Sequence, residues 1–511
     1  MTGLEGTAPG GEDPPNRKDR NLTRKTLGNF LWMFGGGGVE AVLKIVVLIV
    51  LARLLLPAEF GLVSAALTVV ALAEVTGRIG VAPSIVQIKT LTRDHVATGM
   101  VATLVMGLLM AGIVYFLAGP IAVLYRMPEL KPFVEVFALL FLIKGAGLVS
   151  DALLQRNMRF RELALIRLAS YLFGYAAVAI VLAVLDFGAW ALVLGQLAQA
   201  GLQTLLYFLF ARDGLAFGFR WATFTTMFRF GFGVTLTQIG NYISQNADYF
   251  VVGRWLGADA LGYYSRAYLL LKQPAQLVGR MGDQVLFPAL ATIQDDRPRM
   301  ERALNRALSL VAMTQVPLSV LLVVTAPEII LTLMGPQWGP AVLPFQILVG
   351  VLFFRTAYKF VGAILRAAGK VYVAALWQWS HAAAVLAGAI FGQAFGLWGV
   401  SLGVSGAVIF CHLFGLFLVH RVIGVGSRDC MIRLVVYAGL GAVFALALIP
   451  AKAALMTLGG EGIWLLVILC GGFGLAYLGL FAAMPKLFGP EGEILREQLT
   501  RVLRRKRGKQ S

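Results

Sequence analysis

Long apolar segments recur along almost the whole chain, and they constrain its fold more than any other feature. From Thr26 to about residue 484, stretches of roughly twenty or more mainly apolar residues alternate with short polar breaks. A helix of about twenty apolar residues crosses the hydrocarbon core of a bilayer. Only 14% of the residues are charged, whereas soluble domains average about 25%. We therefore expect an integral membrane protein and exclude a soluble domain.

The segments predict an all-α integral membrane protein with about fourteen transmembrane helices. Their approximate bounds are 27–53, 60–80, 93–118, 132–152, 161–185, 188–211, 227–253, 260–286, 303–325, 341–364, 371–392, 396–420, 431–451 and 462–484. Transmembrane barrels are excluded because their strands alternate polar and apolar residues at every second position, and these segments do not.

Basic residues in the connecting loops support this number of crossings. The chain has 44 Lys and Arg against 26 acidic residues, and cytoplasmic loops of membrane proteins carry the excess of Lys and Arg. If the N-terminus is cytoplasmic, seventeen basic residues fall on that side: Arg78, Lys89, Arg93, Arg156, Arg159, Arg161, Arg212, Arg220, Arg229, Arg297, Arg299, Arg302, Arg366, Lys370, Arg421, Arg428 and Arg433. Five fall on the opposite side: Arg53, Arg126, Lys131, Arg254 and Lys452. Both termini are therefore expected to be cytoplasmic.

Four short matches recur in the same order at a nearly constant offset. They pair ARLLLPAEFG (52–61) with GRWLGADALG (253–262), GRIG (77–80) with GRMG (279–282), LLQRNMRF (153–160) with ILRAAGKV (364–371), and FGAW (187–190) with FGLW (395–398). This repetition predicts two homologous six-helix bundles of the same orientation, a plan found in transporters that alternate access around a central site. The expected domains are a disordered cytoplasmic tail (1–22), an N-terminal bundle (23–212), a C-terminal bundle (213–425), an extra helix pair (426–485) and a basic cytoplasmic tail (486–511).

Ionisable residues inside the predicted spans are the candidates for a substrate site, because charges in a bilayer are costly and usually functional. Eight cations stand against five acids. The cations are Lys44, Lys144, Arg167, Arg266, Lys272, Arg280, Arg355 and Lys359. The acids are Glu40, Glu74, Asp151, Asp248 and Asp283. The excess predicts an anion-binding cavity; the alternative is that the cations are paired or reach the membrane interface, as expected for Arg167 and Arg280.

The spacing of these charges separates structural from functional candidates. Glu40 and Lys44 lie one turn apart on one helix face, so an ion pair that stabilises the helix is an equally open interpretation. The same holds for Lys144 and Asp151, which also share one helix face. Like charges one turn apart repel each other, so Arg355 and Lys359 require an acid from another helix or an anionic ligand.

Amide side chains form two stripes at helical spacing. They are Gln238, Asn241 and Gln245, followed by Asp248, and Gln196, Gln199 and Gln203. Amides both donate and accept hydrogen bonds, which suits the recognition of sugar hydroxyls. Hydrogen bonding between helices is the alternative use of such residues in membranes.

No sequence motif for catalysis or metal binding is present. Cys411, Cys430 and Cys470 are scattered and show no metal-ligand spacing, and His381 and His412 are expected to be core histidines. A nucleotide-binding P-loop, an HExxH helix and a GxSxG elbow are all missing, so we expect neither a catalytic residue nor a metal or cofactor. Nucleic acid is excluded as a partner because the basic residues are interleaved with lipid-facing helices.

Four segments carry a resemblance to a known family. They are NADYFVVGRWLGADALGYYSRAYLLLKQP (246–274), VLFPALATIQDD (285–296), MGPQWGPAVLPFQIL (334–348) and LLQRNMRFRELALIRLASYLFG (153–174). From about residue 25 to 485 the chain resembles the Wzx-type polysaccharide flippases, which share a superfamily with MATE multidrug exporters and lipid II flippases. The resemblance implies transport of a polyprenyl-pyrophosphate-linked oligosaccharide across the bacterial inner membrane, for lipopolysaccharide or exopolysaccharide synthesis. It implies the membrane and that lipid as partners, with a polysaccharide polymerase and export proteins as further candidates.

Charge and resemblance together give a site hypothesis. The predicted pyrophosphate-binding residues are Lys44, Lys144, Arg266, Lys272, Arg355 and Lys359. Sugar hydroxyls are assigned to Gln238, Asn241 and Gln245, and ion coupling to Glu40 or Asp248. The protein is expected to act as a monomer. Two alternatives remain: a cation-coupled multidrug exporter, for which an acidic site is expected, and a membrane glycan polymerase or glycosyltransferase, which needs a catalytic loop or acidic motif.

Overall fold

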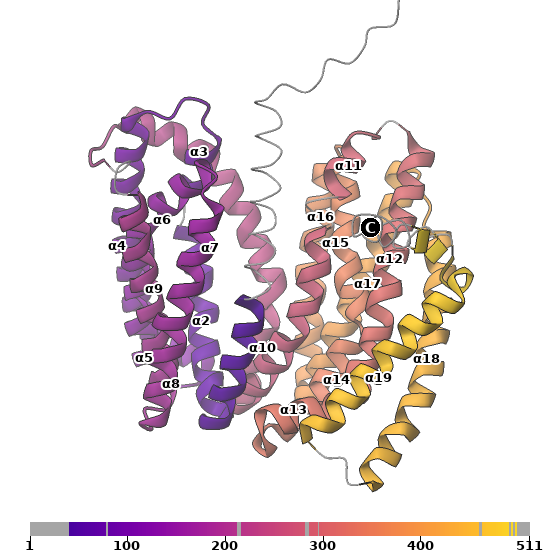
Figure 1. Cartoon of the computed structure of the whole chain (residues 1–511). Helices are drawn as coiled ribbons and strands as arrows, with labels where there is room; N and C mark the ends of the chain where they lie inside the picture. Colours follow the sequence, from indigo (N-terminus) through magenta and orange to yellow (C-terminus); the bar gives the residue numbers. More distant parts are fainter. Residues whose placement is uncertain are drawn as a thin grey trace, which may run out of the picture.

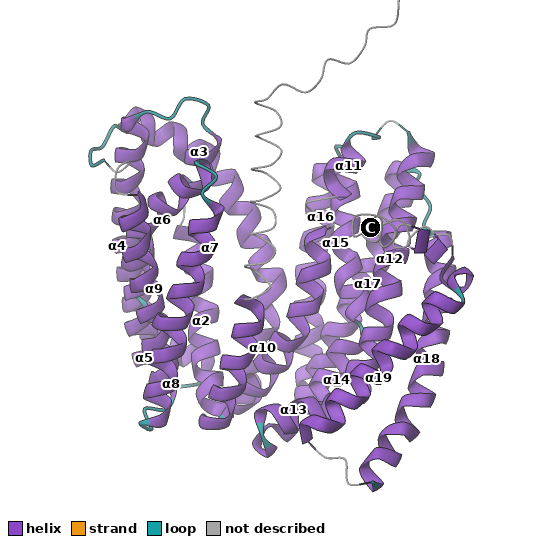
Figure 2. Cartoon of the chain, in the orientation of Figure 1, coloured by secondary structure: helices purple, strands orange, loops and turns teal. Residues whose placement is uncertain are grey.

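Every regular element that the structure describes is helical (Figure 2). The computed structural model describes residues 40–77, 80–211, 216–281, 286–294, 296–458, 462–489, 492–493 and 496–497. The predicted tail 1–22 and nearly all of the predicted tail 486–511 lie outside these residues. Within them, the all-α membrane fold expected from the apolar segments is confirmed.

The first group of helices lies at the left of Figure 1, in indigo to magenta. Its elements are a helix over residues 40–54, α2 (Pro57–Gly77), α3 (Val81–Gln87), α4 (Arg93–Tyr125), α5 (Leu130–Phe137), α6 (Leu139–Arg156), α7 (Phe160–Ala169), the π-helix η1 (Ser170–Ala176), α8 (Ala177–Val184) and α9 (Ala189–Ala211). The predicted span 161–185 therefore consists of three consecutive helical elements, and the central one is a π-helix. Such a segment is rare and occurs frequently at functional sites.

In Figure 1, α10 runs between the two groups of helices. We count it with the second group, which lies at the right of the figure. Its elements are α10 (Trp221–Met281), α11 (Phe287–Ala291), α12 (Arg297–Val324), α13 (Ala326–Met334), η4 (Pro336–Ala341), α14 (Val342–Gly350), α15 (Leu352–Ala367), α16 (Val371–Gly392), η5 (Gln393–Phe395), α17 (Gly396–Ile423), α18 (Arg428–Thr457), α19 (Gly462–Ala483) and η6 (Pro485–Phe488). Gly257, with φ of 89°, divides α10 into two helices.

The described residues contain nine helical segments long and apolar enough to cross a membrane, or ten when the pair bent by 44° at α14 and α15 counts as one span. One of the nine, Tyr372–Ile423, holds both α16 and α17. Neither half of α10 is among them. Several predicted spans are thus merged, divided or partly outside the described residues, and the expected fourteen crossings stay a prediction.

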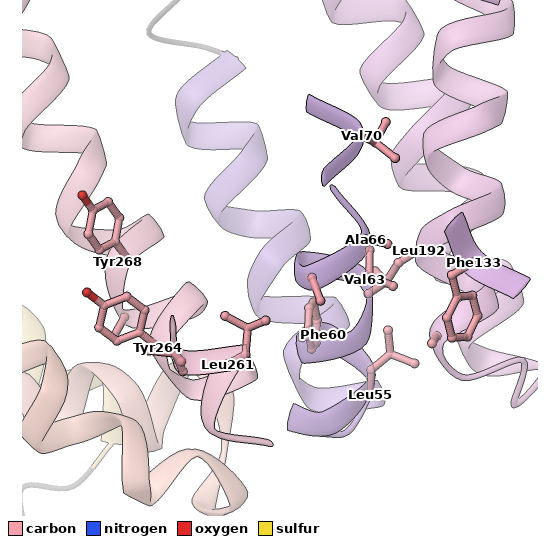
Figure 3. Close-up of a cluster of buried hydrophobic side chains, with 14 of the residues drawn as sticks. Leu55, Phe60, Val63, Ala66, Val70, Phe133, Leu192, Leu261, Tyr264 and Tyr268 are labelled. Atoms are coloured by element: carbon pink, nitrogen blue, oxygen red, sulfur yellow. The ribbon is translucent and has the colours of Figure 1, made fainter. Parts of the chain in front are cut away.

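The two groups meet where α2 crosses the second half of α10. Gly61 packs against the backbone oxygen of Ala258, and Gly262 packs against that of Pro57. The offset of the first sequence match relates Gly61 to Gly262 and Pro57 to Ala258, so the two contacts are equivalent. One turn further along, Ser64 donates a hydrogen bond of 3.1 Å to Ser265, which is related to it by the same offset. Around this crossing, buried side chains of both groups form one apolar cluster that includes Phe60, Leu261 and Tyr264 (Figure 3).

Backbone conformation repeats at the other sequence matches. Met158 and Gly369 both have positive φ, 54° and 72°, and they occupy the same place in the two members of the third match. Gly188 and Gly396, with φ of 55° and 76°, are equivalent in the fourth match. L-residues rarely adopt this conformation, so its recurrence at matched positions points to equivalent turns in the two groups.

At the end of the molecule opposite α3 and α11, the groups are held together by a set of contacts that we term the latch: Arg53, Gln337 and Trp338 with their partners. The Trp338 indole and the Gln337 amide both donate to the backbone oxygen of Ala52, at 2.8 and 3.0 Å. The Arg53 guanidinium donates to the carbonyls of Thr332 and Leu333 at the end of α13. At the α3 and α11 end, the ribbons of the two groups stand further apart (Figure 1).

The helix crossing generates a stability prediction. Replacing Gly61 with Ala adds a methyl group against a backbone oxygen that cannot move away easily, and overpacking of this kind costs about 1–3 kcal/mol. The melting temperature in detergent should fall by a few degrees. Gly112→Ala on α4 is the control, because no heavy atom lies within 4 Å of the added carbon. Equal melting temperatures for the two variants would contradict the crossing.

Candidate functional site

A small cavity of about 50 Å³ in the second group, here named the second-half pocket, collects three of the predicted cations. Its lining comes from α10, α15, α16 and α17: Ser244, Gln245, Tyr268, Lys272, Ala275, Arg355, Tyr358, Lys359, His381, Val385, Val404 and Val408. Lys272 comes from α10, and Arg355 and Lys359 come from successive turns of α15. None of the described residues that line the cavity is acidic, so the charge that they present to it is positive.

Arg355 is held in place but is incompletely hydrogen-bonded. Its guanidinium lies 4.6 Å above the ring of Tyr268 and donates through Nη1 to the Tyr268 hydroxyl. Its Nε and Nη2 are buried and have no hydrogen-bond partner in the described structure. Buried donors are normally satisfied, and an unsatisfied one suggests an absent ligand or water. Two donors on a planar guanidinium match the oxygens of a phosphate or carboxylate.

Asp248 supplies negative charge behind the pocket rather than in it. Its side chain is 1% exposed and accepts hydrogen bonds from the Tyr264 hydroxyl at 2.7 Å and from the backbone N–H of Tyr249 at 3.0 Å. The carboxylate is in electrostatic range of Arg355. One buried acid therefore offsets part of the positive charge of three cations.

His381 lines the second-half pocket, a role that sequence reasoning missed. It is 4% exposed, its ring lies 5.0 Å from that of Tyr358, and neither ring nitrogen has a hydrogen-bond partner among the described residues. It was expected to be a core histidine satisfied by neighbours. In the sequence, His381 lies one turn after the polar residue Gln378, a spacing that could have indicated a polar helix face. In the structure, Gln378 donates to the Ser244 hydroxyl at 2.7 Å.

The predicted amide stripe on α10 reaches this pocket at one end. Gln245 lines the pocket and donates to the Asn241 side chain at 2.9 Å. Asn241 and Gln238 are exposed and continue along the helix. The stripe therefore offers hydrogen-bonding groups beside the cationic pocket.

A larger cavity of about 300 Å³ in the first group is named the first-half pocket. Its lining is Glu74, Gly77, Thr103, Met106, Gly107, Met110, Phe141, Lys144, Gly145, Gly147, Leu148, Asp151, Arg167, Ala200, Gln203, Thr204 and Tyr207. Lys144 forms an ion pair of 2.8 Å with Glu74, a partner that its spacing from Asp151 did not predict. Asp151 instead accepts from Gln155 at 2.9 Å, while its Oδ1 is buried without a partner.

The remaining predicted residues lie outside both pockets. Lys44 forms an ion pair of 2.6 Å with Glu40 and lies 5.6 Å above the ring of Tyr171 in η1. Arg266 stacks on Phe60 at 4.7 Å and donates to the Ser64 hydroxyl at 3.3 Å, at the α2–α10 crossing. The structure thus places the six predicted cations in four locations. Lys44 and Lys144 contact carboxylates, whereas Lys272, Arg355 and Lys359 line one cavity.

Comparison with known proteins establishes the family. Residues 50–343, more than half of the chain, match the sequence profile of the family described as "Polysaccharide biosynthesis protein". The chain belongs to this family. The described residues contain no group of His, Cys, Asp and Glu that could hold a metal ion.

Two bacterial relatives are similar over large parts of the chain. The lipopolysaccharide biosynthesis protein WzxC of Escherichia coli is 28% identical over 359 residues, which are 69% of this chain and 72% of WzxC. The succinoglycan biosynthesis transport protein ExoT of Rhizobium meliloti is 31% identical over 299 residues, 58% of this chain and 60% of ExoT. These relatives confirm the predicted resemblance to Wzx-type proteins.

Two solved structures share the fold. The lipid II flippase MurJ in an inward closed conformation superposes with a TM-score of 0.70 at 16% identity, covering 87% of this chain and 97% of MurJ. An inward-facing multidrug resistance transporter of the MATE family gives 0.62 at 15% identity, covering 75% and 94%. The predicted MATE-like fold is confirmed.

The buried network around Asp248 generates a prediction. Asp248→Asn should lower the melting temperature, because it removes the buried negative charge that acts electrostatically on the Arg355 guanidinium. Adding Arg355→Gln should restore part of the loss. A double-mutant cycle on purified protein measures this coupling. Strictly additive effects would show that the two groups do not interact.

Proposed function

We propose that the protein flips polyprenyl-pyrophosphate-linked oligosaccharide repeat units across the bacterial inner membrane for lipopolysaccharide or exopolysaccharide synthesis. The observation that carries the proposal is the second-half pocket, where Lys272, Arg355 and Lys359 meet without an acid in the lining. Cations held inside a membrane protein favour an anionic ligand, so this cavity supports the binding of an anion. The unsatisfied Arg355 donors fit phosphate oxygens.

The family supports a pyrophosphate as that anion. WzxC is named for lipopolysaccharide and ExoT for succinoglycan, two different polymers. A site shared by such relatives must recognise a group that does not change with the sugar sequence. The pyrophosphate of a lipid carrier is such a group, and the carrier's hydrocarbon chain can stay in the bilayer while its polar head moves.

The arrangement of the two groups supports a mechanism of alternating access. In the proposal, the substrate head enters between the groups from the end where they stand apart, and the cations replace water around its phosphates. The stripe of Gln238, Asn241 and Gln245 binds sugar hydroxyls. Opening the latch and closing the α3 and α11 end then releases the head on the other side. Of the predicted coupling residues, Asp248 lies next to Arg355, whereas Glu40 already pairs with Lys44.

The proposed topology has fourteen crossings and two cytoplasmic termini. It counts the predicted span 27–53 as one, the two halves of α10 as two, the bent α14–α15 pair as one, and α16 and α17 separately. The end with α3 and α11 is then cytoplasmic, which fits the positive-inside distribution of loop charges. A multidrug exporter is the weaker alternative, since a cationic pocket repels cationic drugs.

The central prediction concerns α15. Replacing Arg355 and Lys359 together with Gln should abolish polymer export while protein abundance stays normal, because the phosphates lose their counter-charges. The measurement is surface polysaccharide in a complemented deletion strain. The matched control replaces the exposed cations Lys370 and Arg421 with Gln, which should leave export unchanged. Normal export by the α15 variant would refute the role of the pocket.

A second prediction concerns the latch. Combining Arg53→Ala with Trp338→Phe removes the hydrogen bonds that hold the groups together, so the state open at that end should become more populated. A cysteine at Gln245, in a background without the native cysteines, should react faster with a membrane-impermeant maleimide added to spheroplasts.

The control for the latch lies at the same end. Lys452→Ala removes an ion pair of 2.7 Å with Glu328 that joins α18 to α13 within the second group. It should not change the labelling rate. Equal rates for the latch variant and the parent protein would contradict the assigned role of the latch.

A further inference from the structure

The two pockets occupy corresponding places in the two halves of the chain. The offset that relates Met158 to Gly369 also relates Lys144 to Arg355. Each of these cations lines the pocket of its own half. The pockets can therefore be compared position by position.

Further lining residues follow the same correspondence. Gly147 and Leu148 line the first-half pocket, and their equivalents at this offset, Tyr358 and Lys359, line the second. Ala200 and Val408 do the same at the offset that relates Gly188 to Gly396. Agreement at four positions on two helices indicates one ancestral cavity that exists twice.

The two copies differ in charge. Asp151 in the first-half pocket corresponds to Gly362, and Glu74 corresponds to Ala275 at the offset of the first sequence match. In the other direction, Lys359 stands where the first half has Leu148. Lys272 likewise stands where the first half has Ala71.

Charge balance follows from these differences. The charged residues that line the first-half pocket are two acids and two cations, Glu74, Asp151, Lys144 and Arg167, so their formal charges cancel. The second-half pocket has three cations and no acid in its lining. The positive charge of the second-half pocket favours an anionic ligand. A charged ligand in the first-half pocket would disturb its balanced formal charges.

The first-half pocket has the groups that bind hydroxyls. Asp151 Oδ1 is a buried acceptor without a partner, and Gln203, which donates to Tyr207 at 2.9 Å, adds an amide. The rings of Phe141 and Tyr207 provide apolar faces. Its volume of about 300 Å³ lies at the lower end of the range for small-molecule sites. Balanced charges, mixed donors and acceptors, and aromatic rings suit an uncharged sugar.

We propose that the first-half pocket binds a neutral sugar unit of the same lipid-linked substrate whose phosphates occupy the second-half pocket. The proposal rests on the proposed function. It adds a second sugar site to the amide stripe on α10: the second-half pocket binds the charge common to all carriers, and the first-half pocket binds a neutral sugar unit of the glycan.

The test measures binding of two probes to the purified full-length protein in nanodiscs: undecaprenyl pyrophosphate, and undecaprenyl pyrophosphate that carries a neutral hexose disaccharide. The parent protein should bind the glycosylated probe more tightly. Combining Asp151→Asn with Gln203→Leu should weaken that probe about tenfold and leave the bare carrier unchanged, because only hydrogen bonds to the sugar are lost. Gln393→Leu, outside both pockets, is the matched control and should bind both probes normally.

Two results would overturn the assignment: an equal loss for both probes, or no loss for the glycosylated probe. Replacing both Arg355 and Lys359 with Gln separates this failure from that of the proposed function. If that variant still binds the bare carrier normally, the phosphate site is wrong whatever the first-half pocket does.

A gain of affinity provides a check that misfolding cannot imitate. Asp151→Asn alone leaves the first-half pocket with one net positive charge. It should tighten binding of a carrier whose sugar is glucuronic acid and weaken binding of the neutral disaccharide carrier. A weaker affinity for the acidic carrier would contradict the assigned charge balance.

Discussion

The concentration of positive charge between α10, α15 and α16 is the interaction on which the functional account depends. In a membrane, three cations that line one cavity of about 50 Å³ favour an anionic ligand. The protein itself offers Asp248, which Tyr264 holds behind the pocket. The remaining charge and the unsatisfied donors of Arg355 define what the cavity lacks.

The α2–α10 crossing is a contact that joins the two groups of helices. Reciprocal glycine contacts bring the backbones of α2 and α10 together at one place, and in the proposed mechanism the two halves tilt about this contact. On one side of that contact the latch joins Ala52 to Trp338, and at the other end the helices stand apart. Arg266 stacks on Phe60 at the crossing, outside both pockets.

The all-α membrane fold was predictable because the length of an apolar segment is encoded locally. The structure adds that Gly61 and Gly262, which the repeat offset relates, make reciprocal contacts. Charge pairing was less accessible: Lys144 pairs with Glu74, which lies 70 residues away on another helix, and sequence spacing cannot reveal such a partner. The place of His381 beside a cavity likewise depends on how α16 packs. By contrast, the spacing of Arg355 and Lys359 is visible within one helix, and both residues line one cavity; their role in binding stays a proposal.

One experimental structure can decide where the phosphates of the lipid carrier bind. Electron cryo-microscopy of the protein in nanodiscs with undecaprenyl pyrophosphate should show the phosphates in contact with the Arg355 guanidinium and the ammonium groups of Lys272 and Lys359. The hydrocarbon chain should leave between the two groups of helices. Phosphate density bound elsewhere, with the Arg355 donors satisfied by protein or water alone, would contradict a carrier site in the second-half pocket.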